Sequence, residues 1–152
     1  MRAVSSIVLG LSGGLIIFLA AMLSVHRPWQ PRWEYSTRIG YDFLNLRAQS
    51  KQFDRIAGSL ESSYTCSPIV MYEGVDRCPN PGHDEGCYYS GYIMIRMERS
   101  TEEEQETVAH EVLHAYNDCF HHDISPEEDE QKAQEFAAVV MKEAYGVSQD
   151  AR

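Results

Sequence analysis

Five consecutive residues, His110-Glu111-Val112-Leu113-His114, have the types and spacing needed for hydrolysis at a metal ion. On a helix, positions i and i+4 lie on the same face, so both imidazoles can bind one cation. Glu111 directly follows the first histidine, so its carboxylate is expected beside the metal rather than bound to it. Zinc-assisted attack by water requires two such nitrogen ligands, an open coordination position and an adjacent base. The pattern therefore predicts a Zn²⁺ site with His110 and His114 as ligands and Glu111 as catalytic base.

The sequence around this motif predicts a helix over residues 101–118. Two overlapping capping boxes mark its start, Ser100 with Glu103 and Thr101 with Glu104. The motif then lies near the middle of the helix, where the backbone is most regular. The residues expected on the inward face are Val108, Val112, Ala115 and Tyr116.

A catalytic zinc ion usually has three protein ligands, so a third one is needed. In the extended pattern H-E-x-x-H-x-x-G-x-x-H, the last histidine would fall at Phe120 of this chain. His121 is one residue too late, which turns it by about 100° around a helix. This pattern is therefore rejected, and a carboxylate from a second helix is the better candidate.

Residues 125–145 have the pattern of such a helix, because they begin with Ser-Pro-Glu-Glu and are followed by Gly146. Glu130 shares a face with two alanines, whose small side chains would allow a close approach to the motif helix. Glu130 is the expected third ligand, with Glu127 and His121 as alternatives.

The two helices resemble the signatures of known zinc peptidases. His110–His114 followed by Glu130–Ala133 is similar to the H-E-x-x-H … E-x-x-A signature of gluzincin-like minimal metallopeptidases. The stretch Glu130–Ala137, E-Q-K-A-Q-E-F-A, resembles the E-x-x-A-N-x-F-A segment of ImmA/IrrE-type peptidases, with Gln134 in place of Asn. His110–Cys119 resembles the motif helix of the mitochondrial inner-membrane peptidase that processes an ATP-synthase subunit.

The resemblance covers residues 108–138. It implies a zincin-like fold and a zinc-dependent endopeptidase, with Glu111 as base and Glu130 as third ligand. The spacing from His114 to Glu130 is shorter than in either group, and the cysteine-bearing region before the motif matches neither. The resemblance therefore implies a class of enzyme, but it does not imply a substrate.

Further polar residues near the motif are candidates for supporting roles. Asn117 and Asp118 could hold a ligand imidazole in one tautomer. Candidates for a second hydrogen-bond donor to the oxyanion are Tyr116, His121, His122 and Tyr145.

The first 25 residues contain a nearly continuous apolar run, Ile7–Leu23, which is just long enough to cross a bilayer as a helix. Residues 1–25 are expected to be a membrane anchor, with a cleaved signal segment and a secreted product as the alternative. Residues 26–35 hold two prolines and two tryptophans and are expected to form a juxtamembrane linker. Residues 36–148 then make one domain.

The four cysteines predict the compartment and two cross-links. Cys66, Cys78, Cys87 and Cys119 form an even set in a small domain, which is typical of exported proteins with disulfides. The pairs expected are Cys78–Cys87 and Cys66–Cys119. A structural zinc site and four reduced thiols are the alternatives, and the three arginines after the apolar run weakly favour a cytoplasmic domain. The exported, single-pass arrangement is preferred.

The charge of the chain limits its partners. Lys and Arg total 13 against 23 Asp and Glu, for a formal net charge of −10. Nucleic-acid binding needs a basic surface, so it is not expected. The acidic balance suits a neutral or basic protein or peptide substrate.

The remaining patterns predict an α+β domain. Apolar residues recur at helical spacing over residues 36–61, which predicts one long N-terminal helix. Residues 68–72 and 92–97 are expected as strands of a small sheet, and residues 73–90 as a loop. The later strand either edges the substrate cleft or lies buried within the sheet.

The function expected from these observations is that of a membrane-anchored zinc endopeptidase. Two other functions stay open. One is a catalytically idle zinc-binding interaction domain, which the intact Glu111 argues against. The other is an ImmA-like regulatory peptidase that cleaves a repressor, which reduced thiols and a cytoplasmic location would favour.

Overall fold

The computed structural model describes residues 33–146, except 64, 67–68, 81 and 98. The anchor expected over residues 1–25 lies outside this part of the chain. Among the described residues, no helix has the length and apolar character to cross a bilayer. The elements are, in chain order, β1 (Glu34–Tyr35), α2 (Thr37–Gln49), α3 (Lys51–Ser62), β2 (Val70–Glu73), β3 (Gly86–Tyr89), β4 (Tyr92–Ile95), α4 (Thr101–Phe120) and α5 (Pro126–Tyr145).

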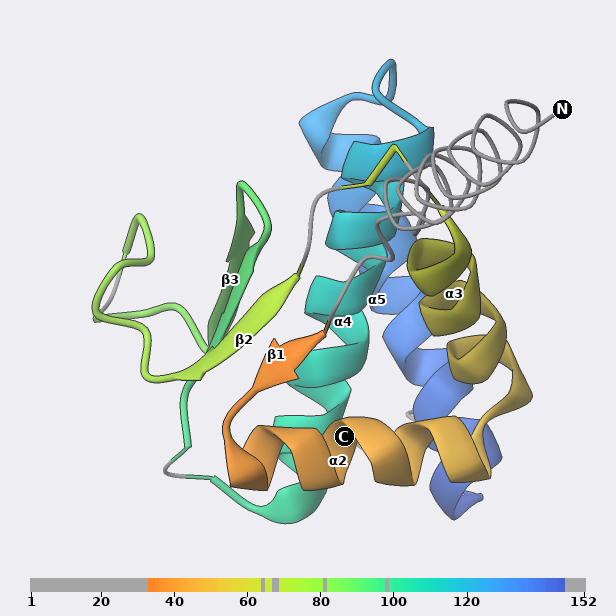
Figure 1. The fold of residues 1–152 in the computed structure, drawn as a ribbon. Helices are drawn as coiled ribbons and strands as arrows, with labels where there is room; N and C mark the ends of the chain where they lie inside the picture. The colour runs from red at the N-terminus through yellow and green to blue at the C-terminus, as the bar shows by residue number, and fades with distance from the viewer. Residues whose placement is uncertain (1–32, 64, 67–68, 81, 98, 147–152) are drawn as a thin grey trace, which may run out of the picture.

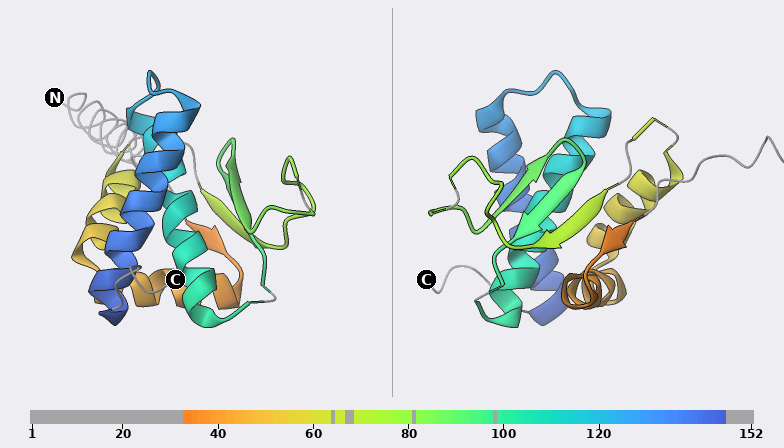
Figure 2. Two further views of the ribbon diagram at one scale, coloured as in Figure 1. Left: turned by 180° about the vertical axis from the view of Figure 1, so that it is seen from behind. Right: turned by 60° about the vertical axis from the view of Figure 1, so that its left-hand side comes forward.

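The predicted α+β class is confirmed, with the sheet and the helices in separate layers (Figures 1 and 2). The sheet has the order β1-β2-β4-β3. Strands β1, β2 and β4 are parallel, and β3 is antiparallel to β4. Helix α4 lies between the sheet on one side and α3 and α5 on the other (Figure 2). The helix that carries the motif is therefore the central element of the domain.

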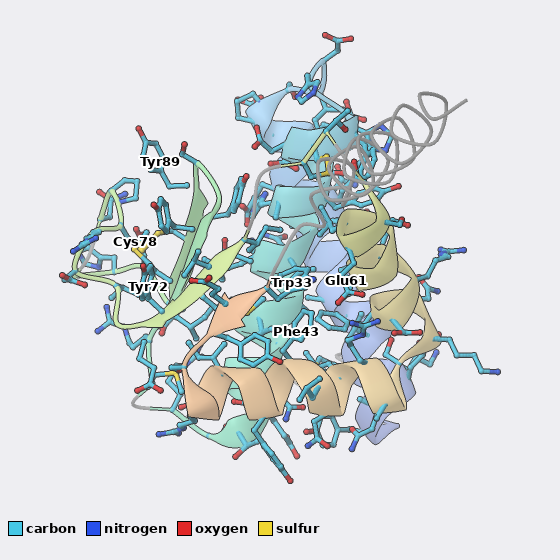
Figure 3. All side chains as sticks on the ribbon, viewed as in Figure 1. Trp33, Phe43, Glu61, Tyr72, Cys78 and Tyr89 are labelled. Carbon is cyan, nitrogen blue, oxygen red and sulfur yellow. A yellow bond between two sulfur atoms is a disulfide. The ribbon has the colours of Figure 1, made fainter. Side chains whose placement is uncertain are left out.

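The core forms where these layers meet, and its buried side chains come mainly from α2, α3, β2, β4, α4 and α5, with Tyr88 of β3 packed against it. Burial of such apolar side chains is the main favourable term in folding. Trp33 packs on Phe43 with ring centroids 4.5 Å apart, between β1 and α2 (Figure 3). The largest fully buried side chains are Ile39, Phe43, Leu46, Phe53, Leu60, Met71, Ile93, Ile95, Val108 and Val112, together with the polar Glu104 and Gln105.

The prediction of one long helix over residues 36–61 is wrong, because the chain turns sharply at Ser50 between α2 and α3 (Figure 1). The backbone N–H of Ser50 ends the first helix by donating to the Leu46 carbonyl at 2.8 Å. Its hydroxyl accepts from the Phe53 N–H at 3.1 Å and so caps the second helix. The same hydroxyl donates to Glu143 of α5 at 2.6 Å, which fixes the bend against the far helix.

Two strands lie where none was predicted. β1 falls inside the expected linker 26–35, and β3 falls inside the expected loop 73–90. β3 and β4 form a hairpin closed by Ser90 and Gly91, with φ angles of 49° and 87°. Positive φ at both central residues is typical of a type I′ hairpin turn. As a result, β4 is an interior strand and β3 is the edge strand.

The cysteines form the two expected pairs, Cys66–Cys119 and Cys78–Cys87. The first joins the segment before β2 to the last turn of α4, and the second joins the loop after β2 to β3. Cys78, Tyr72 and Tyr89 lie on the side of the sheet that faces away from the helices (Figure 3). There Cys78 packs with Val75 and Met94 in a small second cluster.

Candidate metal centre

Helix α4 begins as its sequence predicts. Ser100 and Glu103 form the capping box, and the helix continues two residues beyond the predicted end, to Phe120. The second expected box is absent, because Thr101 is already the first helical residue. Instead the Glu104 carboxylate is buried and accepts from Arg38 of α2 at 2.6 Å. The motif lies in the rigid middle of this helix.

Helix α5 also has the predicted boundaries. Ser125 caps its first turn by accepting from the Glu128 N–H at 3.2 Å, and Gly146 ends it with a φ of 67°. Ala133 and Ala137 are both buried on α5, which packs along α4. These small side chains bring the two helices close together, which places Glu130 beside the motif.

Three side chains from the two helices converge on one point. The Nε2 atoms of His110 and His114 are 3.0 Å apart. Oε2 of Glu130 lies 3.5 Å from each of them. Tetrahedral zinc with bonds of about 2.0–2.1 Å would separate neighbouring ligand atoms by about 3.3 Å. The three donor atoms therefore already have the spacing of a tetrahedral zinc site with its fourth position open, and among the described residues they form the cluster able to hold a metal.

The orientations of His114 and Glu130 are each fixed by a second contact. His114 Nδ1 lies 2.6 Å from Oδ2 of Asp129, so the ring donates there and leaves Nε2 free as a lone-pair donor. Asn117 holds that carboxylate by donating to its Oδ1 at 2.7 Å. On Glu130, Oε1 accepts from Gln134 at 2.8 Å, which turns Oε2 towards the histidines. These contacts preorganise the donor set.

The protonation states suit a cation as well. Burial, and then the neighbouring His114, lowers the pKa of His110, which favours the neutral imidazole that metals bind. Glu111 is only 5% exposed. Burial, and then the nearby Glu130 carboxylate, raises the pKa of Glu111 to about 8. A buried acid with a pKa near neutrality can both accept and return a proton.

The site opens into a cleft between the helices and the edge strand. Its walls are β3, the exposed side of α4, and the first turns of α5. Among the residues that line the cleft are Gly86, Tyr88, His110, Glu111, His114, Asp129 and Glu130.

The other predicted site residues are divided between the cleft and the core. His121 and His122 line the cleft near the end of α4. Tyr116 and Tyr145 do not, because both pack against the core on other sides of their helices. The ring of Tyr116 packs against Phe120 in a tilted arrangement, and Tyr145 donates to Gln105 at 2.5 Å. Neither tyrosine is placed to contact a reacting group.

The alternatives for the third ligand are not in the cluster. Glu127 is exposed on the first turn of α5 and is not part of the cleft wall. His121 is the C-cap of α4, and its ring lies beside Tyr116. Of the three candidates, Glu130 is the one whose carboxylate meets both histidines.

Two residues of the site were missed in the sequence. Asp129 was passed over as one member of an acidic run, although it is the direct partner of His114. Tyr88 was assigned to a loop, but it belongs to β3 and donates to Asp118 at 2.7 Å. A strand signal was present, since Tyr88-Tyr89 precedes a Ser-Gly turn. Asp118 therefore binds this tyrosine rather than a ligand imidazole.

Comparison with models of protein families, with curated proteins and with solved structures finds no match to this chain. The function is therefore argued from the geometry of the site.

Proposed function

We propose that this chain is a zinc-dependent endopeptidase of zincin-like architecture. The observation that carries the proposal is the convergence of His110, His114 and Glu130 with the Glu111 carboxylate beside them. A site that only stores metal has no need of a buried base next to it. The intact Glu111 therefore supports catalysis over the idle interaction domain.

His110, His114 and Glu130 would hold the zinc ion. When bound, zinc would supply a Lewis acid that polarises the scissile carbonyl and acidifies water. Glu111 takes the proton from the attacking water and then delivers it to the leaving amine. Asp129 keeps His114 in the tautomer that presents Nε2. His121 and His122 line the same cleft and are the candidates for a further hydrogen bond to the oxyanion.

The cleft suits an extended polypeptide. It is about 1670 Å³ in volume, far more than a metal ion and a water molecule require. One of its walls is the edge strand β3, and an extended peptide can pair with such an edge through backbone hydrogen bonds. Because β3, not β4, is the edge strand, β3 is the element proposed to receive substrate.

The charge of the cleft favours basic or neutral substrates. Acidic side chains predominate in its wall, among them Glu106, Asp118 and Asp129. Arg99 also lines the cleft, but it is paired with Glu85 and Glu103 at 3.4 Å each. A positively charged peptide would therefore be drawn towards the site more strongly than an acidic one.

The test uses the full-length chain. Purified protein is assayed for bound zinc and for cleavage of a peptide library, next to Glu111→Gln and to Glu127→Gln as a matched control. We expect zinc in all three proteins, and loss of activity by at least about 100-fold in Glu111→Gln alone. Zinc without cleavage in the unaltered chain would overturn the proposal and favour the idle domain. The membrane anchor and the exported location stay predictions from the sequence.

A further inference from the structure

Strand β3 lies directly on the motif helix. At Gly86, a Cβ atom would come within 2.5 Å of Thr107 Cγ2 and 3.2 Å of Glu111 Cγ. A side chain there would force the Thr107 side chain, or the backbone around it, to shift. The backbone of the edge strand is thus in contact with the residue proposed as the catalytic base.

The next inward residue of the strand, Tyr88, directs its backbone towards the same base. Arg96 N–H donates to the Glu85 carbonyl at 2.8 Å, so this pair is hydrogen-bonded across the hairpin. Hydrogen-bonded pairs alternate in an antiparallel ladder, so the N–H of Tyr88, opposite Ile93, points away from β4. That N–H faces the Glu111 carboxylate.

The side chain of Tyr88 makes a second contact with α4. Its hydroxyl donates to Asp118 Oδ2 at 2.7 Å. Tyr88 therefore faces Glu111 of α4 with its backbone and binds Asp118 of the same helix through its phenol. These two points lie on either side of His114 along the helix.

Both ends of the Tyr88–Asp118 contact are next to a half-cystine. Cys87 precedes Tyr88 and is joined to Cys78, and Cys119 follows Asp118 and is joined to Cys66. One disulfide holds the strand and the other holds the end of the helix. The hydrogen bond between Tyr88 and Asp118 thus joins two residues that are each adjacent in sequence to a disulfide-bonded cysteine.

We propose that the Tyr88–Asp118 hydrogen bond is a clasp that fixes β3 on α4 and thereby sets the position of the Glu111 carboxylate. Tyr88 is then a positioning residue, because it acts on the reaction through Glu111. This role rests on the proposed function only in that Glu111 is the base. The contact between strand and helix exists whether or not the chain cleaves peptides.

Hydrogen exchange tests the clasp without any assay of activity. Deuterium uptake of the peptide that contains residues 86–89 is followed by mass spectrometry in the full-length, chelator-treated chain. The variants are Tyr88→Phe, which removes only the hydroxyl, and Asp118→Ala, which removes its acceptor. Tyr89→Phe is the matched control, since Tyr89 is 68% exposed on the other face of the same strand.

We expect exchange to be about tenfold faster in Tyr88→Phe and in Asp118→Ala, and unchanged in Tyr89→Phe, because a hydrogen bond to a charged group is lost. Unchanged exchange in the first two variants would overturn the clasp. Equal acceleration in all three would also overturn it, because it would show a general loosening of the strand.

Kinetics then test the link to Glu111. In Tyr88→Phe, kcat should fall about tenfold while KM and the zinc content stay within twofold, because a misplaced base affects the chemical step. An unaltered kcat with accelerated exchange would overturn the positioning role. Absence of cleavage by the unaltered chain would instead refute the proposed function, and the exchange result would still decide the clasp.

Discussion

Asp129 and Glu130 are consecutive residues of α5, yet both lie beside the ring of His114, one near each nitrogen. Asp129 lies 2.6 Å from Nδ1, and Glu130 lies 3.5 Å from Nε2. The two nitrogens of an imidazole face opposite directions, so the ring fits between two acids that diverge along the helix. This arrangement fixes the tautomer and the metal-binding direction of His114 at once.

Removal of Asp129 should weaken zinc binding without loss of a ligand. Partners of ligating histidines typically contribute 10- to 100-fold to metal affinity. We therefore expect Asp129→Ala to bind zinc about 10- to 100-fold more weakly, as measured by competition with a chelating dye. Glu127→Ala, on the same helix turn but outside the cluster, is the control and should bind as tightly as the unaltered chain. Equal affinity in all three proteins would contradict the proposed role of Asp129.

The metal-free protein should lose stability as the pH rises, through Glu111. Its pKa is raised from 4.5 to about 8 in the folded chain, so the folded state binds this proton more tightly than the unfolded state. The contribution of the protonated Glu111 carboxyl to stability is fully present below about pH 4.5, and it is lost as the pH rises to about 8. Glu111→Gln keeps a neutral side chain and avoids this loss.

We therefore expect chelator-treated Glu111→Gln to be more stable than the unaltered chain at pH 8, on the order of 1–3 kcal/mol. The two should be equally stable at pH 4.5. Urea denaturation at the two pH values measures the difference. A stability change of the same size at both pH values would show that Glu111 is not destabilised by ionisation.

Gly86 should tolerate no side chain, because of its contact with Thr107 and Glu111. Gly86→Ala is expected to destabilise the protein by about 1–3 kcal/mol through overpacking and to lower peptidase activity. Gly82→Ala provides the control, because a Cβ at Gly82 meets nothing within 4 Å. Thermal denaturation of both variants measures the effect, and equal melting temperatures would contradict the close approach of β3.

The two disulfides should contribute unequally to stability. Cys66 and Cys119 are 53 residues apart in sequence, and Cys78 and Cys87 are nine apart. Chain-entropy estimates for loops of these lengths are about 4 and about 2.5 kcal/mol. Replacement of both members of a pair by serine should therefore lower the free energy of unfolding more for Cys66–Cys119. The reverse order in urea denaturation would contradict this expectation.

The helices that carry the site could be predicted because their signals are local. Ser100 with Glu103, and Ser125 followed by proline, mark helix starts through contacts within four residues. The face shared by Glu130 and its two alanines is also local, since it follows from helical periodicity. The convergence of this face with the motif could therefore be expected before the fold was known.

The bend at Ser50 could not be predicted from periodicity. Leu46 and Phe53 are seven residues apart, which fits one continuous helix as well as two. Ser50 at the bend also contacts Glu143, which lies 93 residues away. Contacts of this kind become visible only when the helices are packed.

The edge strand was missed for a related reason. The segment 86–89 is too short to show an alternating pattern of apolar and polar residues. Its first two residues, Gly and Cys, are also typical of a loop. The strand is defined by its pairing with β4 and by its contact with α4. Asp129 was missed because one acid in a run cannot be told from its neighbours until a partner such as His114 is in place.

The Cys66–Cys119 bond would also hold the chain together after cleavage of a peptide bond between the two cysteines. Most described residues of the loop from Gly74 to Glu85 are exposed, which makes this loop the natural place for a cut, including one made by another copy of the same molecule. Both fragments would stay covalently joined, because the bond spans the whole loop. A nicked molecule would thus keep its histidines and its acids on one covalent assembly, and would separate into two pieces only under reducing conditions.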